Sequence, residues 1–181
     1  MNHVPESHEI PRAGQPAGDD GRSDLRADCE SCFGLCCVAL PFAASADFAI
    51  DKPAGTPCIN LQSDFRCGIH AELRPQGFRG CTVYDCYGAG QKVSQVTFEG
   101  RDWRSAPETA PRMFAVLPIM RQLHELLWHL GEALTLTAAR PLHAQITAAI
   151  EATESLTRGV LTRLLQWTSG RTGTRLSLIH I

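Results

Sequence analysis

The chain carries eight cysteines, and four of them lie within nine consecutive positions. These four occur in the stretch DCESCFGLCCV, which begins at Asp28. Two residues separate Cys29 from Cys32, a spacing that lets two thiolates in one tight turn hold one ion. Thiolates are soft donors that suit zinc, copper(I) and iron–sulfur clusters. The stretch therefore predicts a metal centre.

Cys36 and Cys37 are adjacent, which raises a geometric difficulty. Cys36 lies one short loop after Cys32 and can reach the same ion. Neighbouring side chains usually point apart, so the pair is not expected to serve one tetrahedral ion symmetrically. We expect one of the two to face a second site or to be a buried thiol. A disulfide between them would be strained and is the least favoured alternative.

All eight cysteines are candidate metal ligands, and eight thiols fit two sites as well as one cluster with spare thiols. Burial as small apolar side chains would explain one or two of them but not their clustering. The first choices are Cys29, Cys32, Cys36, Cys58, Cys67 and Cys81, followed by Cys37 and Cys86.

The amino-acid composition restricts the compartment and the class of protein in which these thiols could act. The N-terminal residues lack the charged and apolar regions of a secretory signal, and no window approaches the roughly 20 apolar residues of a membrane span. The net charge of -2 gives no signal for nucleic acid. We therefore expect a cytoplasmic protein, whose clustered thiols are reduced and bind metal rather than form disulfides. No catalytic constellation is recognised, so we do not expect an enzyme.

The cysteine pattern resembles the CxxCxxCC (YkgJ-like) family of zinc- or iron-chelating proteins. The resemblance covers residues 28–86, about a third of the chain, and it implies a chelating site. This chain departs from the family in a first cluster one residue longer, in His70 where the family usually has tyrosine, and in a delayed Cys81. The matching residues are Cys29, Cys32, Cys36, Cys37, Cys58, Leu61, Cys67, Ile69, Arg74, Pro75 and Cys81.

Two further polar residues lie within this pattern. His70 follows Cys67 by three positions, a spacing that could complete a zinc site or simply place a polar residue on a turn. Arg74 could donate hydrogen bonds to thiolate sulfurs or form a surface ion pair. Both alternatives stay open for each residue.

The cysteine region through YDCYGAGQKVSQVTF is also similar to the leader of a group of bacterial pentapeptide-repeat proteins. The repeat itself, A-[DN]-L-x-x, does not occur in this chain. The final LSLIHI looks like a translated sequencing adapter. We therefore expect the natural chain to continue beyond about residue 175, with any repeats lost from this sequence.

Four segments are expected along the chain. The cysteine segment has little periodic apolar surface, so we expect a metal to staple it. Within it, residues 48–50, 81–84 and 93–98 could be short strands, and residues 67–74 one or two helical turns. The segments are a disordered leader at 1–26, a cysteine-rich metal-binding module at 27–104, a helical region at 105–168 and a tail at 169–181.

The helical region shows a clear pattern of three- and four-residue steps between apolar side chains from Met113 to Leu130. Pro118 marks either a helix start or a kink, and Gly131 is expected to end the helix. A second helix is expected after Pro141, and Gly159 need not interrupt it. The fold class is thus an irregular module with short strands or turns, followed by a helical hairpin or small bundle.

The function expected from these residues is zinc or iron binding with a structural, sensory or metal-handling role. One alternative is an iron–sulfur redox or accessory protein. Another is an interaction protein whose leucine-rich helices dock an unknown protein partner and whose thiols form redox-switched disulfides. His124 and Trp128 share a helix face, and we interpret them as packing residues rather than cofactor ligands.

Overall fold

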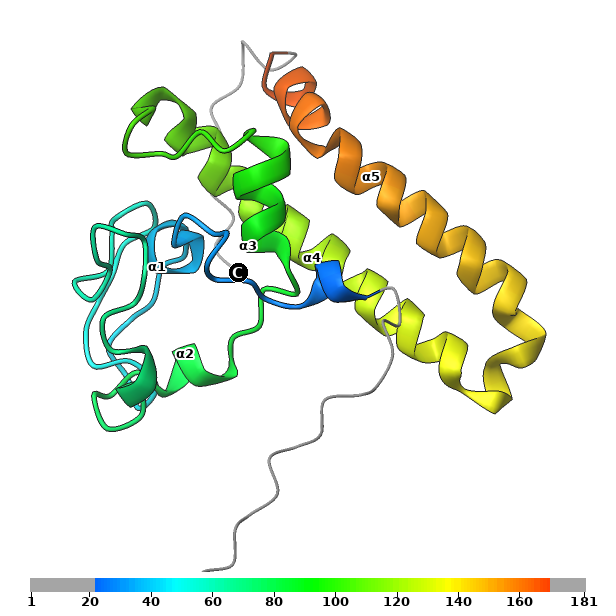
Figure 1. Ribbon diagram of the computed structural model, residues 1–181, viewed down its shortest axis with the longest axis horizontal. Coiled ribbons are helices and arrows are strands. Elements are labelled where there is room, and N and C mark those ends of the chain that lie inside the picture. Colours follow the sequence, from blue (N-terminus) through cyan, green and yellow to red (C-terminus); the bar gives the residue numbers. More distant parts are fainter. Residues whose placement is uncertain (1–21, 170–181) are drawn as a thin grey trace, which may run out of the picture.

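The structure is a computed structural model that describes residues 22–169, so the expected tail and most of the expected leader lie outside the described residues. The described part is mostly helical. It contains no strand, only two isolated bridges, which pair Phe42 with Lys52 and Leu61 with Cys67. Figure 1 shows an irregular cysteine-bearing region on one side of the molecule and a long helical hairpin on the other.

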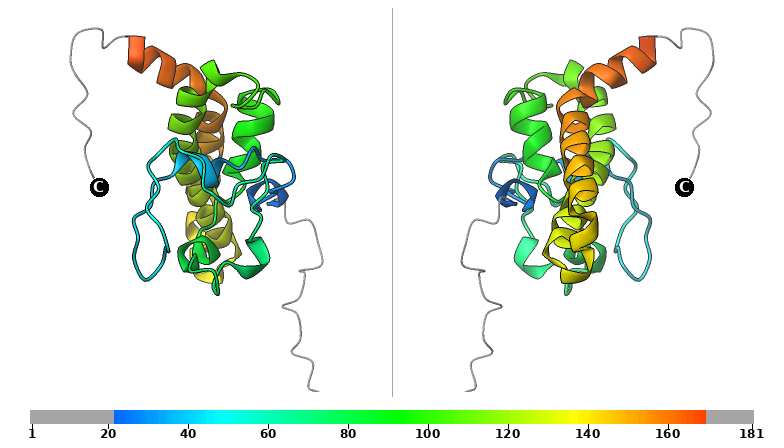
Figure 2. Two further views of the ribbon diagram at one scale, coloured as in Figure 1. Left: turned by 90° about the vertical axis from the view of Figure 1, so that its left-hand side faces the viewer. Right: turned by 90° about the vertical axis from the view of Figure 1, so that its right-hand side faces the viewer.

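The expected hairpin is confirmed. It consists of α4 (Ala110–Thr135) and α5 (His143–Ser169), joined by the 3-10 segment η5 (Thr137–Leu142). The two helices run antiparallel side by side (Figures 1 and 2). No helix in residues 22–169 is long and apolar enough to cross a membrane.

The two predictions about the course of α4, at Pro118 and at Gly131, have different outcomes. Pro118 lies inside the helix, one of the two expected possibilities. The prediction that Gly131 ends α4 is wrong, because the helix continues to Thr135. A Cβ at Gly131 would lie 3.0 Å from Arg22 Cδ, so the missing side chain leaves room for the Arg22 chain. Helix packing here outweighs the small intrinsic cost of glycine.

The main hydrophobic core lies along one face of α4. Met113, Val116, Leu117 and Met120 are almost fully buried there. They pack with α1 (Leu35–Ala39), with α3 (Ala89–Gln91) and with the π-helical segment η3 (Lys92–Thr97) that follows α3. The cysteine-bearing region therefore shares an apolar core with the hairpin.

The predicted short strands are wrong. Residues 81–83 belong to α2 (Arg79–Val83), and residues 93–97 belong to η3. Val96 and Phe98, which an extended segment would place on one face, differ in burial, with Val96 60% exposed and Phe98 buried. Residues 48–50 are irregular, with a bend at residues 49 and 50. The predicted turn at 67–74 is present as the 3-10 helix η2 (His70–Glu72).

The expected boundary of the leader needs correction. Residues 22–26 are described, and Ser23–Leu25 form the 3-10 helix η1, which packs against α4. Gly88 has φ +75°, and a Cβ there would lie 1.9 Å from the Asp24 carbonyl oxygen. This close backbone approach requires glycine and ties η1 to the segment that follows Cys86.

Candidate metal centre

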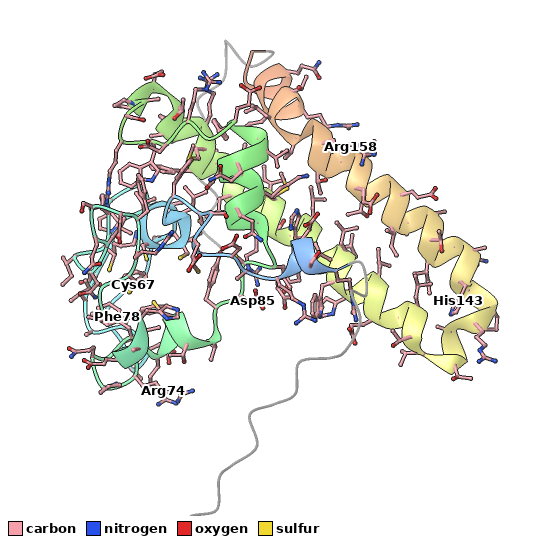
Figure 3. All side chains as sticks on the ribbon, viewed as in Figure 1. Cys67, Arg74, Phe78, Asp85, His143 and Arg158 are labelled. Carbon is pink, nitrogen blue, oxygen red and sulfur yellow. The ribbon has the colours of Figure 1, made fainter. Side chains whose placement is uncertain are left out.

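All eight cysteines lie in the described part of the chain, and all carry free thiols. They come from α1, α2 and the loops around them, and Figure 3 shows Cys67 and Phe78 in the space between α1 and α2. Within residues 22–169, no three cysteine, histidine, aspartate or glutamate side chains already surround a point where a metal ion would fit. The thiols nevertheless form two groups, which the adjacent residues Cys36 and Cys37 connect.

The first thiol group consists of Cys29, Cys32 and Cys86. A Cβ built on Gly90 would lie 2.7 Å from Cys32 Sγ and 3.9 Å from Cys86 Sγ. The sulfurs of Cys32 and Cys86, which are far apart in the sequence, therefore both lie close to Gly90. Cys29 begins the turn that carries Cys32, and the pKa of its thiol is raised by desolvation and then by the charges of Cys36 and Cys86.

The loop that carries Cys29 and Cys32 is held by polar side chains of α3 and η3. Gln91 donates to a backbone carbonyl of residue 26 at 2.7 Å and accepts the N–H of residue 28 at 3.2 Å. Ser94 Oγ accepts the N–H of Phe33 at 3.1 Å, and Gln95 donates to the carbonyl of residue 31 at 2.8 Å. These hydrogen bonds replace regular secondary structure as the support of the loop.

Arg66 holds the same loop from the opposite side. Its guanidinium donates to the carbonyl oxygens of Cys29, Glu30 and Cys32, with an Nη2–O distance of 2.6 Å to Glu30. The sequence analysis did not identify this residue. Its position directly before Cys67 was the available signal, because a planar group with five donors suits several carbonyls of one turn.

Cys86 is positioned by α4 through its two sequence neighbours. Arg121 Nε donates to the Asp85 carbonyl at 2.8 Å, and His124 Nδ1 donates to the Tyr87 carbonyl at 2.7 Å. His124 is 3% exposed, and burial lowers its pKa. These contacts agree with the interpretation of His124 as a packing residue.

The second thiol group consists of Cys37, Cys58, Cys67 and Cys81, which pack around the buried Leu73 and Phe78 in a small apolar cluster of their own. The N–H of Cys58 donates to the Cys37 carbonyl at 2.8 Å. The bridge between Leu61 and Cys67 brings Cys67 back beside Cys58, and α2 contributes Cys81. Phe42 and Phe48 stack at 4.4 Å and cover this cluster.

Cys36 and Cys37 connect the two groups. Their Sγ atoms are 3.9 Å apart on α1, far beyond the roughly 2.05 Å of a disulfide bond. Gly34, with φ +65°, begins this helix, and a Cβ there would lie 2.9 Å from the Phe65 carbonyl oxygen. The tight turn at Gly34 therefore brings the adjacent thiols close to the chain segment that carries Cys67.

The thiols share a local environment that disfavours their charged form. Burial raises the pKa of Cys32 and of Cys81 to about 11 each. The hydrogen bond between Cys36 and Cys37 raises the pKa of Cys36 well above its ordinary value, and desolvation and the charge of Cys37 act in the same direction. Without a cation these thiols are neutral near pH 7 and are poor nucleophiles. A bound metal ion would replace the protons and stabilise the thiolates.

Two other polar groups lie close to the thiols. The hydroxyl oxygen of Tyr84 is buried without a hydrogen-bond partner, and the pKa of Tyr84 is raised by burial and then by the charges of Cys36 and Cys86. Lys52 is 3% exposed, and its ammonium donates to three backbone carbonyls at 3.0 to 3.2 Å. Burial lowers the pKa of Lys52, whereas the thiolates of Cys58 and Cys37 raise it.

The other predicted residues lie further out. His70 is exposed at the start of η2, and Arg74 is exposed and points away from the thiols in Figure 3. The exposed position of Arg74 does not favour the first of its two expected roles, a hydrogen-bond donor to thiolate sulfurs. His143 is distant, in the first turn of α5.

A separate pocket of about 640 Å³ lies between η1, α4 and α5. Its lining includes the positive residues Arg22, Lys92 and Arg158 and the negative residues Asp24 and Glu154. The mixture of charges favours neither an anion nor a cation, and no cysteine borders the pocket. The thiol groups therefore remain the stronger candidate for chemistry.

The comparisons with known proteins identify a relative of this chain but do not indicate an activity. No protein-family model matches the chain, and no solved structure matches it. The chain is 60% identical over 147 residues to YybG of Bacillus subtilis (strain 168), which is described as an uncharacterized protein. The match covers 81% of this chain and 53% of the relative, so the chain spans about half the length of the curated relative it matches. This cysteine-rich chain is thus a close homologue of part of YybG.

Proposed function

We propose that the cysteine-bearing region binds zinc or iron through its thiolates and that this chain is a metal-binding protein rather than an enzyme. The observation that carries the proposal is that, of eight free cysteines, four pack in one small apolar cluster, while Cys32 and Cys86 both lie close to Gly90. Such a density of soft donors matches the ligands of structural zinc and iron–sulfur sites.

The groups around the thiols fit a bound cation with thiolate ligands. The hydroxyl of Tyr84 is buried without a hydrogen-bond partner, and the charges of Cys36 and Cys86 contribute to its raised pKa. The buried ammonium of Lys52 lies near the second thiol group and would offset the net negative charge of a metal–thiolate centre. Both features are costly next to neutral thiols and favourable next to metal-bound thiolates.

The same environment argues against cysteine catalysis. A catalytic cysteine needs a lowered pKa, usually from a cation or a helix N-terminus beside it. In this chain the pKa values of Cys32, Cys36 and Cys81 are all raised. We therefore assign the thiols to metal binding in a reducing compartment, with a structural, sensory or metal-handling role.

The helical hairpin has a bracing role in this proposal. Arg121 and His124 of α4 hold the backbone on both sides of Cys86, and α3 and η3, which pack on α4, hold the loop of Cys29 and Cys32. The hairpin thus supports the metal site mechanically. Docking of a partner on its exposed leucines would be a second use of the same helices.

The test is anaerobic purification of the whole chain, followed by metal analysis and an absorption spectrum of the same sample. The whole chain is needed because the cysteine-bearing region shares its core with α4. Colourless protein with bound zinc supports a structural or metal-handling role, and brown protein with iron and sulfide supports an iron–sulfur centre. Folded protein that binds neither metal would contradict the proposal and favour redox-switched thiols.

A further inference from the structure

We propose that the eight cysteines form two separate four-thiolate metal centres rather than one cluster. This inference rests on the proposed metal binding and specifies it. The first centre comprises Cys29, Cys32, Cys36 and Cys86, and the second comprises Cys37, Cys58, Cys67 and Cys81.

The first centre follows from contacts between segments that are distant in sequence. Cys32 and Cys86 both lie above Gly90, at 2.7 and 3.9 Å from its Cβ position. Cys29 precedes Cys32 in the same turn, whose geometry is set by the Cys32 N–H donating to the Cys29 carbonyl at 3.3 Å. Cys86 is the residue least expected in this centre, since the sequence places it after Cys81, a member of the other centre.

The second centre lies in an apolar cluster of its own, which meets the main core at Leu61. Its four cysteines pack around Leu73 and Phe78, whereas Cys32 of the first centre packs against the main core. The two proposed centres therefore have different apolar surroundings even though their ligands alternate along the chain.

The assignment of the adjacent pair rests on the packing of Cys37. The Sγ atoms of Cys36 and Cys37 lie 3.9 Å apart on α1, so this adjacent pair marks the place where the two proposed centres adjoin. Cys37 packs in the cluster of the second centre, and its carbonyl accepts the Cys58 N–H. Cys36 is exposed at this junction, and its assignment to the first centre gives each ion four thiolates.

Metal binding by these thiols requires no oxidation or reduction. Four thiols lose four protons to solvent as one divalent ion enters each centre, which leaves a net charge of -2 on each loaded centre. Two polar groups would bear on these charges: the Tyr84 hydroxyl, which is buried without a hydrogen-bond partner, and the buried Lys52 ammonium, which donates to the carbonyl of Val38, the residue after Cys37.

The first measurement is an anaerobic titration of the metal-free whole chain with Co²⁺, a coloured probe of tetrahedral thiolate sites. We expect two Co²⁺ per chain, with magnetic moments of independent ions because no thiolate bridges them. One ion per chain, or two ions with coupled moments, would overturn the division into separate centres. Failure to bind any Co²⁺ or Zn²⁺ would instead overturn the proposed metal binding itself.

Paired substitutions then test which cysteines belong together. Cys32→Ser with Cys86→Ser removes two ligands from one centre, and Cys58→Ser with Cys81→Ser removes two from the other. Each of these variants should keep one tight ion. The matched control, Cys86→Ser with Cys81→Ser, leaves the same number of thiols but damages both centres, so it should keep none.

Equal losses in all three paired variants would contradict the assignment. Far-ultraviolet circular dichroism of each variant reports whether the hairpin is still folded. If a paired variant does not fold, the stoichiometry and magnetic moment of the unmodified chain still decide between two separate centres and one cluster.

Discussion

The helical hairpin and the cysteine-bearing region are stabilised in different ways. In the hairpin, α4 and α5 satisfy their own backbone and bury an apolar stripe. Between residues 28 and 86, the longest helices have five residues each, and side chains such as Gln91 and Arg66 satisfy much of the backbone. The difference indicates that the hairpin folds by local periodicity, whereas the cysteine-bearing region depends on contacts between distant residues and on its thiols.

Metal removal should produce the largest contrast between the two regions. Because binding energy of a thiolate-bound ion is also folding energy, a chelator should release amide protection across residues 28–86. Protection in α4 and α5 should fall much less. Hydrogen exchange of the whole chain with and without chelator measures both regions at once. Equal loss of protection in the two regions would show that they unfold as one unit.

Truncation of a core side chain should affect the hairpin strongly. Leu117 is 1% exposed, so Leu117→Ala should lower the free energy of unfolding by about 2–5 kcal/mol. Leu126→Ala on the same helix is the matched control, because Leu126 is 46% exposed and should lose much less. Urea denaturation of both variants provides the comparison. Similar losses would place the core on a different face of α4.

A methyl group at Gly90 should damage the first thiol group selectively. The added Cβ would lie 2.7 Å from Cys32 Sγ, so Gly90→Ala should displace this sulfur and weaken one of two Co²⁺ sites at least about tenfold. Gly159→Ala is the control, since the nearest side-chain atom at that position lies 3.5 Å away. That variant should instead stabilise α5 by roughly 1 kcal/mol. Unchanged Co²⁺ affinity in Gly90→Ala would contradict the position given to Cys32.

The smallest effect concerns the pH dependence of the contact between the two regions. Burial lowers the pKa of His124 below the ordinary histidine value of about 6.5, so the unfolded chain binds a proton more readily than the folded chain. Stability from this residue is therefore present above about pH 6.5 and is lost as the pH falls through the lowered value. Lys92 and Asp24 face His124 and act in opposite directions.

His124→Gln should remove part of this dependence, because glutamine does not titrate. Thermal melts of both proteins between pH 7.5 and about pH 5 test the sign. The difference between the two melting temperatures should shrink as the pH falls. A difference that grows at low pH would mean that His124 is charged in the folded chain.

Sequence reasoning succeeded where structure is local. The three- and four-residue steps from Met113 onward predicted α4, and the segment after Pro141 predicted α5, because the burial of one helix face is encoded within each helix. It failed at 81–84 and 93–98, where a few alternating residues are compatible with either a strand or a short helix. Burial of Val93 and Ser94 beside α4 selects the helical form.

The sequence by itself determined that all eight cysteines lie in the first half of the chain and that two long helices follow them. Only the tertiary structure decided that Cys86 lies beside Cys32, that Arg66 holds the loop of Cys29 and Cys32, and that the Tyr84 hydroxyl is buried without a partner. The physical reason is distance along the chain. Spacing predicts which donors can share one turn, whereas the meeting of separate turns depends on how α3, η3 and α4 pack.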